Sequence, residues 1–110
     1  MEQAEFMLVY VVCANLEEAK HIAKSVLERR LAACANIIST IHSLYWWEGK
    51  IQEGTETLLI LKAPYSYYEE IEKVVKQLHS YEVPAILRVP ITQGLSEYLR
   101  WLATETEFDY

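Results

Sequence analysis

Thiol and imidazole side chains are the groups in this sequence that are best suited to hold a metal ion. The chain has two cysteines, Cys13 and Cys34, and three histidines. Thiolate sulfur is the ligand that a soft ion such as Cu(I) prefers, with imidazole as its natural co-ligand. His79 follows a predicted helix, and Glu82 stands close behind it as an oxygen donor. These residues indicate a candidate copper site formed by His79, Glu82 and one of the two cysteines.

Each of these residues also has a purely structural interpretation. Free cysteine is among the most buried residue types and packs as a small hydrophobe. A single histidine at the end of a helix commonly caps the last carbonyl groups. Both interpretations stay open for Cys13, Cys34 and His79 at the level of sequence.

A second set of residues could line a pocket for a small molecule. Aromatic walls with a few converging charges are the usual composition of such sites. Tyrosine and tryptophan are equally typical of interfaces between subunits. The set consists of Lys62, Tyr81, Glu82, Tyr98 and Trp101.

No familiar catalytic signature is present. The chain lacks a phosphate loop, an HExxH motif and a CxxC motif, and it has only 3 glycines from which to build a nucleotide cradle. The sequence therefore favours a binding protein over an enzyme.

Composition limits the partners and the compartment. The 110 residues suit a single domain, 1–110, and the net charge of −6 with scattered Lys and Arg disfavours nucleic acid and anionic membranes. The apolar run at 6–14 is too short to span a bilayer, and Glu2 and Glu5 precede it where a signal peptide would be positive. Two cysteines set no disulfide framework, so we expect a reducing cytoplasm.

Hydrophobic patterns predict an α+β fold. Phe6–Cys13 is typical of a central strand, and Asn15 with Glu18 forms a capping box before a helix over 16–31. Ser66 with Glu69 predicts a second capping box, and Ser96 a cap for a last short helix. The expected order is strand 6–13, helix 16–31, strands 34–47 and 50–62, a helix ending near His79, an edge strand 85–89 and the C-terminal helix. This is the ferredoxin-like βαββαβ order with both helices on one face of an antiparallel sheet.

The segment from Cys34 to Lys62 predicts one very long β-hairpin. Glu48-Gly49 supplies a two-residue loop, which pairs Trp47 with Lys50, His42 with Thr55 and Ala35 with Lys62. Gly54 is a candidate bulge. Roughly 13 residues per strand give an arm of ~43 Å, whereas a compact chain of this length is only ~34 Å across.

The far half of this arm carries large apolar side chains on both faces. They are Leu44, Tyr45, Trp46, Trp47 and Ile51. Exposed apolar strands with free edges invite pairing with another chain. We therefore expect an obligate homo-oligomer held together through the hairpin arms.

Five segments together resemble the divalent-cation tolerance protein family, CutA. They are Leu31–Asn36, Tyr45–Lys50, Leu59–Lys62, His79–Pro84 and Tyr98–Trp101. The resemblance covers nearly the whole chain in order and with matching spacing. It implies a ferredoxin-like homotrimer whose hairpins wrap neighbouring subunits, similar to the PII signalling proteins, and a role in tolerance of divalent metals, above all copper.

The resemblance also assigns roles to particular residues. The family's histidine falls at His79, with Ser80 where proline is usual, and Cys34 matches a cysteine that is common in the family. The family's first-strand cysteine falls at Val11, and Cys13 lies two residues later on the same face of the strand. The βαββαβ order does not ensure that Cys13 and His79 meet within one subunit, and a boundary between subunits is the other place where they could meet.

Two functions follow from these observations. The first is a trimeric cytoplasmic metal-binding protein with copper at His79, at Cys13 or Cys34, and at Glu82. The alternative is a PII-like sensor or scaffold that binds a small molecule or a protein in clefts between subunits, through Lys62, Tyr81, Glu82, Tyr98 and Trp101.

Overall fold

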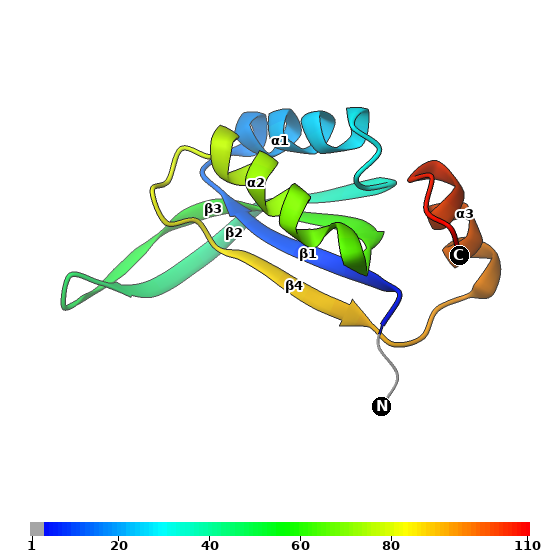
Figure 1. Ribbon diagram of the computed structural model, residues 1–110. Helices are drawn as coiled ribbons and strands as arrows, with labels where there is room; N and C mark the ends of the chain where they lie inside the picture. The colour runs from blue at the N-terminus through cyan, green and yellow to red at the C-terminus, as the bar shows by residue number, and fades with distance from the viewer. Residues whose placement is uncertain (1–3) are drawn as a thin grey trace.

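Residues 4–110, described by a computed structural model, form a four-stranded antiparallel sheet with two of the three α-helices packed on one face (Figure 1). The strands lie in the order β2-β3-β1-β4, so β1 and β3 are central neighbours. The elements are β1 (Phe6–Cys13), α1 (Leu16–Glu28), β2 (Cys34–Trp47), β3 (Lys50–Pro64), the 3-10 turn η1 (Tyr65–Tyr67), α2 (Tyr68–Leu78), β4 (Ile86–Ile91) and α3 (Ser96–Glu105). The predicted ferredoxin-like α+β fold, with its long hairpin and C-terminal helix, is confirmed.

The core lies between the sheet and the two helices α1 and α2. Side chains of a strand alternate between its faces, and on β1 the fully buried residues Met7, Val9 and Val11 face the helices. They meet Ile22 of α1 and Val75 of α2, which are equally buried. Full burial of each such side chain contributes about 1.5–3 kcal/mol. The same alternation carries Cys13, the last residue of β1, into the core.

The opposite face of the sheet is apolar and lies below α1 and α2 in Figure 1. Leu8 and Tyr10 of β1 are half-buried on this face, and their partners on β4 are Val89 and Leu87. Val89 is 43% exposed and Leu87 is 57% exposed. Within residues 4–110, neither α1 nor α2 covers this open sheet face.

The hairpin turn lies where the sequence predicts it. Glu48 and Gly49 have φ of 51° and 77°, which is the positive-φ pair of a tight two-residue loop. Trp47 pairs with Lys50, and His42 pairs with Thr55, as predicted. The large apolar residues of the arm are exposed, with Trp46 at 72%.

The predicted bulge at Gly54 is wrong. Gly54 pairs regularly with Ser43, and the register shifts instead between Ser39 and Ile41 on β2. The shift places Cys34, rather than Ala35, opposite Lys62. A bulge adds one residue to one strand, and either strand of a hairpin can carry it with the same turn and the same hydrophobic pattern.

The hairpin makes the molecule long for its size. The principal extents are 45 × 32 × 22 Å, and the Cα radius of gyration is 14.7 Å. A compact domain of this length would have a radius of gyration of about 13 Å. The arm projects to the left in Figure 1, beyond the layer of helices.

Several predicted element ends differ from those observed. α1 ends at Glu28 rather than Leu31, because Arg30 adopts a φ of 59° that a helix cannot continue. Ser66 lies within the 3-10 turn, so α2 begins without a side-chain cap, as does α3 at Ser96. β4 runs to Ile91 through Pro90, which an edge strand tolerates since its free side needs no donor.

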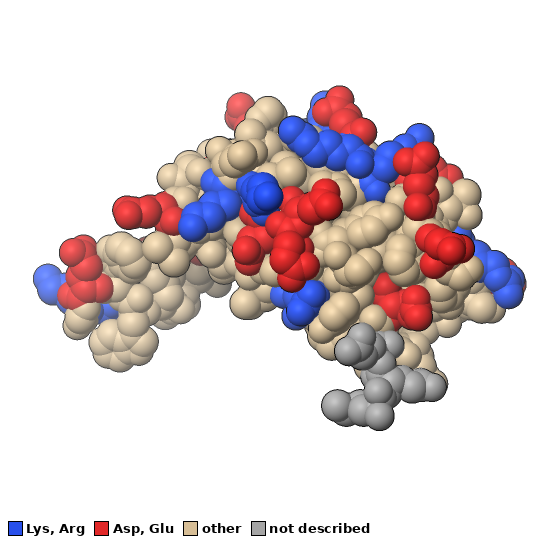
Figure 2. Space-filling view, in the orientation of Figure 1, with Lys and Arg blue, Asp and Glu red and all other residues tan. Residues whose placement is uncertain are grey.

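The surface carries charges of both signs. On the face shown in Figure 2, Lys and Arg are interspersed with Asp and Glu and form no continuous basic band. None of the helices within residues 4–110 is long and apolar enough to cross a membrane.

Candidate metal centre

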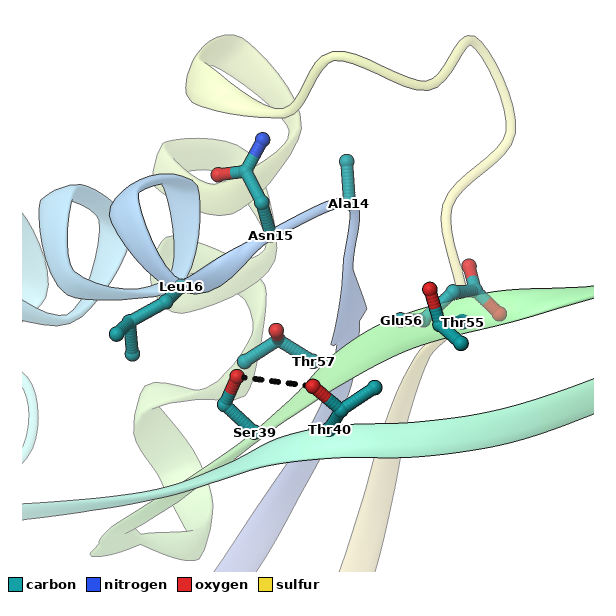
Figure 3. A pocket seen from close by; sticks show the side chains of 8 residues that line it. All are labelled: Ala14, Asn15, Leu16, Ser39, Thr40, Thr55, Glu56 and Thr57. Carbon is teal, nitrogen blue, oxygen red and sulfur yellow. Dashed lines mark hydrogen bonds between the residues drawn. The ribbon is translucent and has the colours of Figure 1, made fainter.

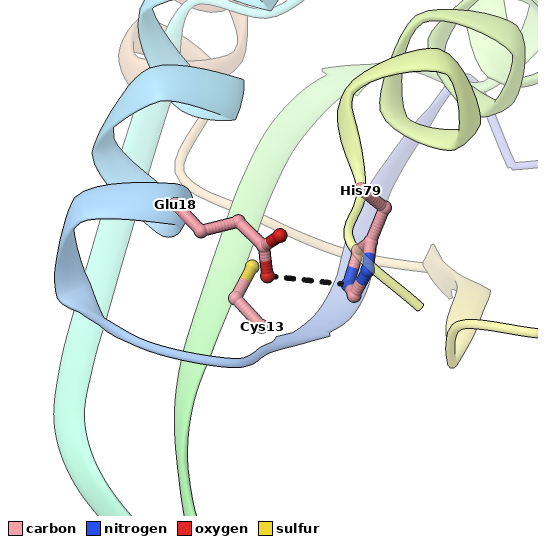
Figure 4. A group of neighbouring side chains, drawn as sticks. All are labelled: Cys13, Glu18 and His79. Carbon is pink, nitrogen blue, oxygen red and sulfur yellow. Dashed lines mark ion pairs between the residues drawn. The ribbon is translucent and has the colours of Figure 1, made fainter. Parts of the chain in front are cut away.

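Three side chains that can bind metal meet where β1 ends and α1 begins. Cys13 ends β1, Glu18 lies in the first turn of α1, and His79 follows the last residue of α2. One ligand atom of each (thiol sulfur, carboxylate oxygen or ring nitrogen) lies within 4.8 Å of the other two. Figure 4 shows them converging from three elements. We refer to them as the Cys–Glu–His cluster.

The N-terminus of α1 positions the carboxylate. Asn15 Oδ1 accepts a hydrogen bond from the Glu18 N–H at 2.8 Å, which is the predicted N-cap. The Glu18 carboxylate turns back over the end of β1, where Oε2 accepts from the Ala14 N–H at 2.7 Å. A capping box would have used the Asn15 N–H instead. Glu18 thus links the cap of α1 to the last residues of β1.

The hydrogen bonds of His79 fix its tautomer. The Tyr81 backbone N–H can only donate, so His79 Nδ1, 3.0 Å away, accepts from it. The Val12 carbonyl can only accept, so His79 Nε2, 2.7 Å away, carries the proton and donates it. The ring is therefore the neutral Nε2–H tautomer, and it connects the end of α2 to β1 rather than capping the carbonyls of α2.

Glu18 is held in its ionised form by backbone donors. Oε1 accepts from the Ser80 N–H at 2.7 Å, in addition to the bond from Ala14 to Oε2. Burial opposes ionisation of the carboxyl, but the hydrogen bonds from Ala14 and Ser80 outweigh it and hold the pKa of Glu18 below its usual value. Glu18 Oε2 lies 3.9 Å from His79 Nε2, the contact dashed in Figure 4.

Cys13 is held in its protonated form. Burial raises the pKa of the thiol from 9.0 to about 12, and the carboxylates of Glu18 and Glu56 add to the effect. Its side chain is fully buried. The thiol is therefore inert at neutral pH until a metal or another cation replaces its proton.

Tyr81 packs against His79 beside the cluster. Its ring lies 4.8 Å from that of His79, and its hydroxyl donates to Glu56 Oε2 at 2.8 Å. Burial and the hydrogen bond to Glu56 raise the pKa of Tyr81, so the hydroxyl keeps its proton. Tyr81 is thus fastened to β3 through its side chain and to His79 through its backbone.

The structure brings Cys13 and His79 together within one chain. The sequence did not decide whether these two residues meet in one chain. The ring of His79 reaches the end of β1 because α2 ends beside that strand. Glu18 is the member that the sequence analysis missed as a ligand. Its position in a capping box was the available signal, because that places a carboxylate beside the last strand residue.

Two predicted ligands lie outside the cluster. Cys34 is at the start of β2, where it pairs with Lys62 and its thiol contacts Asn36 Oδ1 at 3.8 Å. Glu82 is exposed in the connector between α2 and β4. Neither belongs to the group of donor atoms found around Cys13 among residues 4–110.

The predicted pocket residues divide into two places. Lys62 Nζ lies 3.3 Å from the Tyr98 hydroxyl and 5.4 Å from the centre of its ring, and Trp101 packs on Tyr98 at 5.5 Å. Tyr81 and Glu82 instead lie in the connector beside the Cys–Glu–His cluster. The set therefore does not form one pocket within the chain.

A polar hollow adjoins the base of the arm. It measures about 160 Å³. Figure 3 shows its hydroxyl groups, among them Ser39, Thr40 and Thr57, with Glu56 at one side. Its lining contains none of the three side chains of the cluster. It shares three residues with the cluster's surroundings: Ala14 and Asn15, which are hydrogen-bonded to Glu18, and Glu56, the partner of Tyr81.

The donor set suits a thiophilic metal. It combines a soft sulfur, an imidazole nitrogen and a carboxylate oxygen at mutual distances short enough for one ion. Each donor is also engaged: the thiol holds a proton, Nε2 donates to Val12, and both Glu18 oxygens accept from backbone amides. Binding would therefore require a proton to leave and hydrogen bonds to be exchanged.

The ferredoxin-like α+β fold with a projecting hairpin and a thiol–imidazole–carboxylate cluster defines a small domain with one candidate metal centre within residues 4–110. The profile of the CutA1 divalent ion tolerance protein family matches residues 7–105. The chain belongs to this family, as its sequence motifs indicated.

Individual relatives agree with this assignment. The divalent-cation tolerance protein CutA of Archaeoglobus fulgidus is 44% identical over 99 residues, which cover 90% of this chain and 96% of that protein. A solved structure of the periplasmic divalent cation tolerance protein CutA from A. fulgidus has a TM-score of 0.89, with 42% identity over 92% of this chain and 98% of that one. The chloroplastic protein CutA 1 of rice is 43% identical over 100 residues, which cover 91% of this chain but 56% of that protein.

Proposed function

We propose that this protein contributes to metal tolerance by binding copper at the Cys–Glu–His cluster. The observation that carries the proposal is the approach of a thiol, a carboxylate and an imidazole to within 4.8 Å of one another. Membership of a divalent ion tolerance family supports a role with metals in general. The proposal assigns binding, and no catalysis.

Copper is preferred to other metals because of the sulfur. Thiolate selects Cu(I), and among divalent ions copper has the highest affinity for nitrogen and oxygen ligands. His79 would supply Nε2, which faces Glu18, and Cys13 would supply its sulfur after losing a proton. A metal that prefers oxygen ligands gains little from such a set.

Uptake of copper should release protons. At neutral pH the Cys13 thiol is protonated because burial and the carboxylates of Glu18 and Glu56 raise its pKa to about 12. One proton must leave for each ion bound, so the apparent affinity should weaken about tenfold for each unit that the pH is lowered.

Competition with a chelator of known affinity tests the proposal. We expect one Cu(I) per chain in the wild type, and loss of this binding in Cys13→Ser and in His79→Ala. Cys34→Ser is the matched control, since Cys34 lies outside the cluster. Equal binding by the wild type and Cys13→Ser would refute the cluster as the copper site.

We further propose that the protein is a homotrimer. The open sheet face with Leu87 and Val89 and the apolar arm with Trp46 and Trp47 are surfaces that a single chain leaves in water. Sedimentation equilibrium should give the mass of three chains, whereas a stable monomer at micromolar concentration would contradict the proposal.

The second candidate function is small-molecule binding between subunits. Its supporting observation is the contact of Lys62 with Tyr98 and the packing of Trp101 on Tyr98, which place a cation beside two exposed aromatic rings. An anionic metabolite that binds there should change tryptophan fluorescence in the wild type and not in Trp101→Phe. A panel of nucleotides and carboxylic acids without effect would argue against this function.

The cytoplasmic location belongs to the proposal as well. Cys13 and Cys34 are both unpaired, as suits a reducing compartment. Among relatives, the CutA protein of A. fulgidus is described as periplasmic and that of rice as chloroplastic. Fractionation of cells with an antibody to the native chain tests the location directly.

A further inference from the structure

The backbone amide of Tyr81 determines which nitrogen of His79 carries the proton. An amide N–H has no lone pair to offer, so the short contact of 3.0 Å to Nδ1 exists only while Nδ1 is unprotonated. In a neutral imidazole the proton then sits on Nε2, where it is bonded to the Val12 carbonyl. Nε2 is also the nitrogen that faces Glu18 (Figure 4).

This tautomer cannot bind a metal through Nε2. To offer the Nε2 lone pair, the imidazole of His79 must carry its proton on Nδ1 instead. The ring stays neutral, and the hydrogen bond from Nε2 to the Val12 carbonyl is lost. Nδ1–H then faces the Tyr81 N–H, and two donors 3.0 Å apart repel each other. The Tyr81 backbone must therefore move away when Nε2 becomes a ligand.

The hydroxyl of Tyr81 opposes this movement. It donates to Glu56 Oε2 at 2.8 Å on β3, and its ring rests on that of His79. A hydrogen bond to an ionised carboxylate is among the stronger ones that a protein makes. Glu56 also lines the hollow at the base of the arm (Figure 3), so the contact joins the connector to the arm.

We infer that Tyr81 is a positioning residue. Its backbone N–H holds His79 in the tautomer whose Nε2 cannot bind metal, and the hydrogen bond from its hydroxyl to Glu56, which we call the latch, holds that backbone in place. The inference rests on the proposed copper site. Since coupling between two contacts is reciprocal, a metal that breaks the latch binds more tightly once the latch has been removed. Tyr81 thereby sets the copper concentration at which the site fills.

Two measurements test the role of Tyr81. Nitrogen-15 spectra of the imidazole in the metal-free wild type should show that His79 is protonated at Nε2 and unprotonated at Nδ1. Stoichiometric Cu(I) should reverse this pattern and speed exchange of the Tyr81 amide. Protonation of Nδ1 in the metal-free protein would overturn the inference.

The second measurement is copper affinity in Tyr81→Phe, which lacks only the hydroxyl. We expect Cu(I) to bind about tenfold more tightly, the effect of one hydrogen bond to a charged group. Tyr65→Phe, in which the changed tyrosine packs beside Arg88 instead, should bind as the wild type does. Equal or weaker binding in Tyr81→Phe would overturn the inference.

The same titrations separate this inference from the proposed function. If the wild type and Cys13→Ser bind copper equally, the copper site and the role of Tyr81 are both refuted. If Cys13→Ser loses binding while Tyr81→Phe is unchanged, the copper site stands and only the role of Tyr81 is refuted.

Discussion

Glu18 fastens three segments of the chain with one carboxylate. It accepts hydrogen bonds from Ala14, at the end of β1, and from Ser80, after α2, while its own N–H is capped by Asn15. Its side chain is only 11% exposed. Loss of its charge should therefore weaken the fold as well as the metal centre.

We predict that Glu18→Gln lowers the free energy of unfolding by roughly 1.5–3 kcal/mol at pH 7, the range for hydrogen bonds to a charged group. The native pKa of Glu18 is lowered, so its stabilising contribution is complete above the ordinary pKa of 4.5 and is lost as the pH falls through the lower native pKa. Denaturant unfolding at pH 7 and pH 3, at one protein concentration, measures both effects.

Glu17→Gln is the control for this experiment. Glu17 shares the first turn of α1 but is exposed, so its variant should unfold as the wild type does. A Glu18→Gln protein that is as stable as Glu17→Gln at pH 7 would contradict the role of Glu18.

The two thiols should differ sharply in reactivity. The rise in the pKa of Cys13 from 9.0 to about 12 lowers its thiolate fraction roughly a thousandfold at pH 8, since each pKa unit is a factor of ten. Cys34 is only half-buried. We predict that iodoacetamide modifies Cys34 and leaves Cys13 intact, as measured by mass spectrometry of peptides.

Denatured protein supplies the control for alkylation, because both cysteines should then react. Rapid modification of Cys13 in the native protein would show that the thiol is accessible and ionised.

The sequence predicted part of the candidate site. Side-chain chemistry was enough to select Cys13 and His79, because few residue types bind soft metals. Their meeting within one chain depends on where α2 ends relative to β1, where His79 contacts Val12, 67 positions before it. Glu18 accepts hydrogen bonds from backbone amides, and Tyr81 donates its own backbone N–H to His79. The capping-box spacing was the one sequence signal for Glu18, and no residue-type pattern encodes the contact of Tyr81.

At the scale of elements, the hairpin turn is set by local chemistry. Glu48-Gly49 determines the turn and the pairs next to it, so the predicted register holds from Trp47 to Ile41. The bulge on β2 between Ser39 and Ile41 lies where the arm leaves the body of the sheet. Its strand could not be predicted, because the turn determines only the pairs near it and either strand of the hairpin can carry the extra residue.

The positive φ of Gly49 gives a direct test of the turn. We predict that Gly49→Ala destabilises the protein by about 1–2 kcal/mol, because a Cβ is strained at a φ of 77° although nothing lies within 4 Å. Gly54→Ala has equal space and no positive φ, so it should be neutral or stabilising. Thermal unfolding measures the melting temperatures of the two variants, and equal shifts from the wild type would contradict this account.

At the scale of the whole molecule, one face of the sheet is central to the proposed assembly. The length of the arm and its apolar tip could be predicted from sequence, because both follow from the turn position and residue types. The predicted order, with both helices on one face, already implied an open face, but the residues on it could not be identified until the register of β1 and β4 was known. Leu8, Tyr10, Leu87 and Val89 then form a second surface that disfavours a free monomer.

We predict that Val89→Asp dissociates the proposed homotrimer. A carboxylate on the open sheet face would be buried without a partner in the assembly, which costs several kcal/mol. Val83→Asp is the matched control, because Val83 is 76% exposed in the connector. Light scattering should show a smaller particle for Val89→Asp alone, and an unchanged mass for both variants would contradict the assignment of this face.

Anomalous diffraction from crystals grown with one equivalent of Cu(I) per chain tests the central claim most directly. We predict one peak per chain at the copper edge, between Cys13 Sγ, Glu18 and His79 Nε2, with the Tyr81 amide displaced from Nδ1. A peak at Cys34 or on the arm, with the Cys–Glu–His cluster still hydrogen-bonded as it is here, would contradict the claim that this cluster is the copper site.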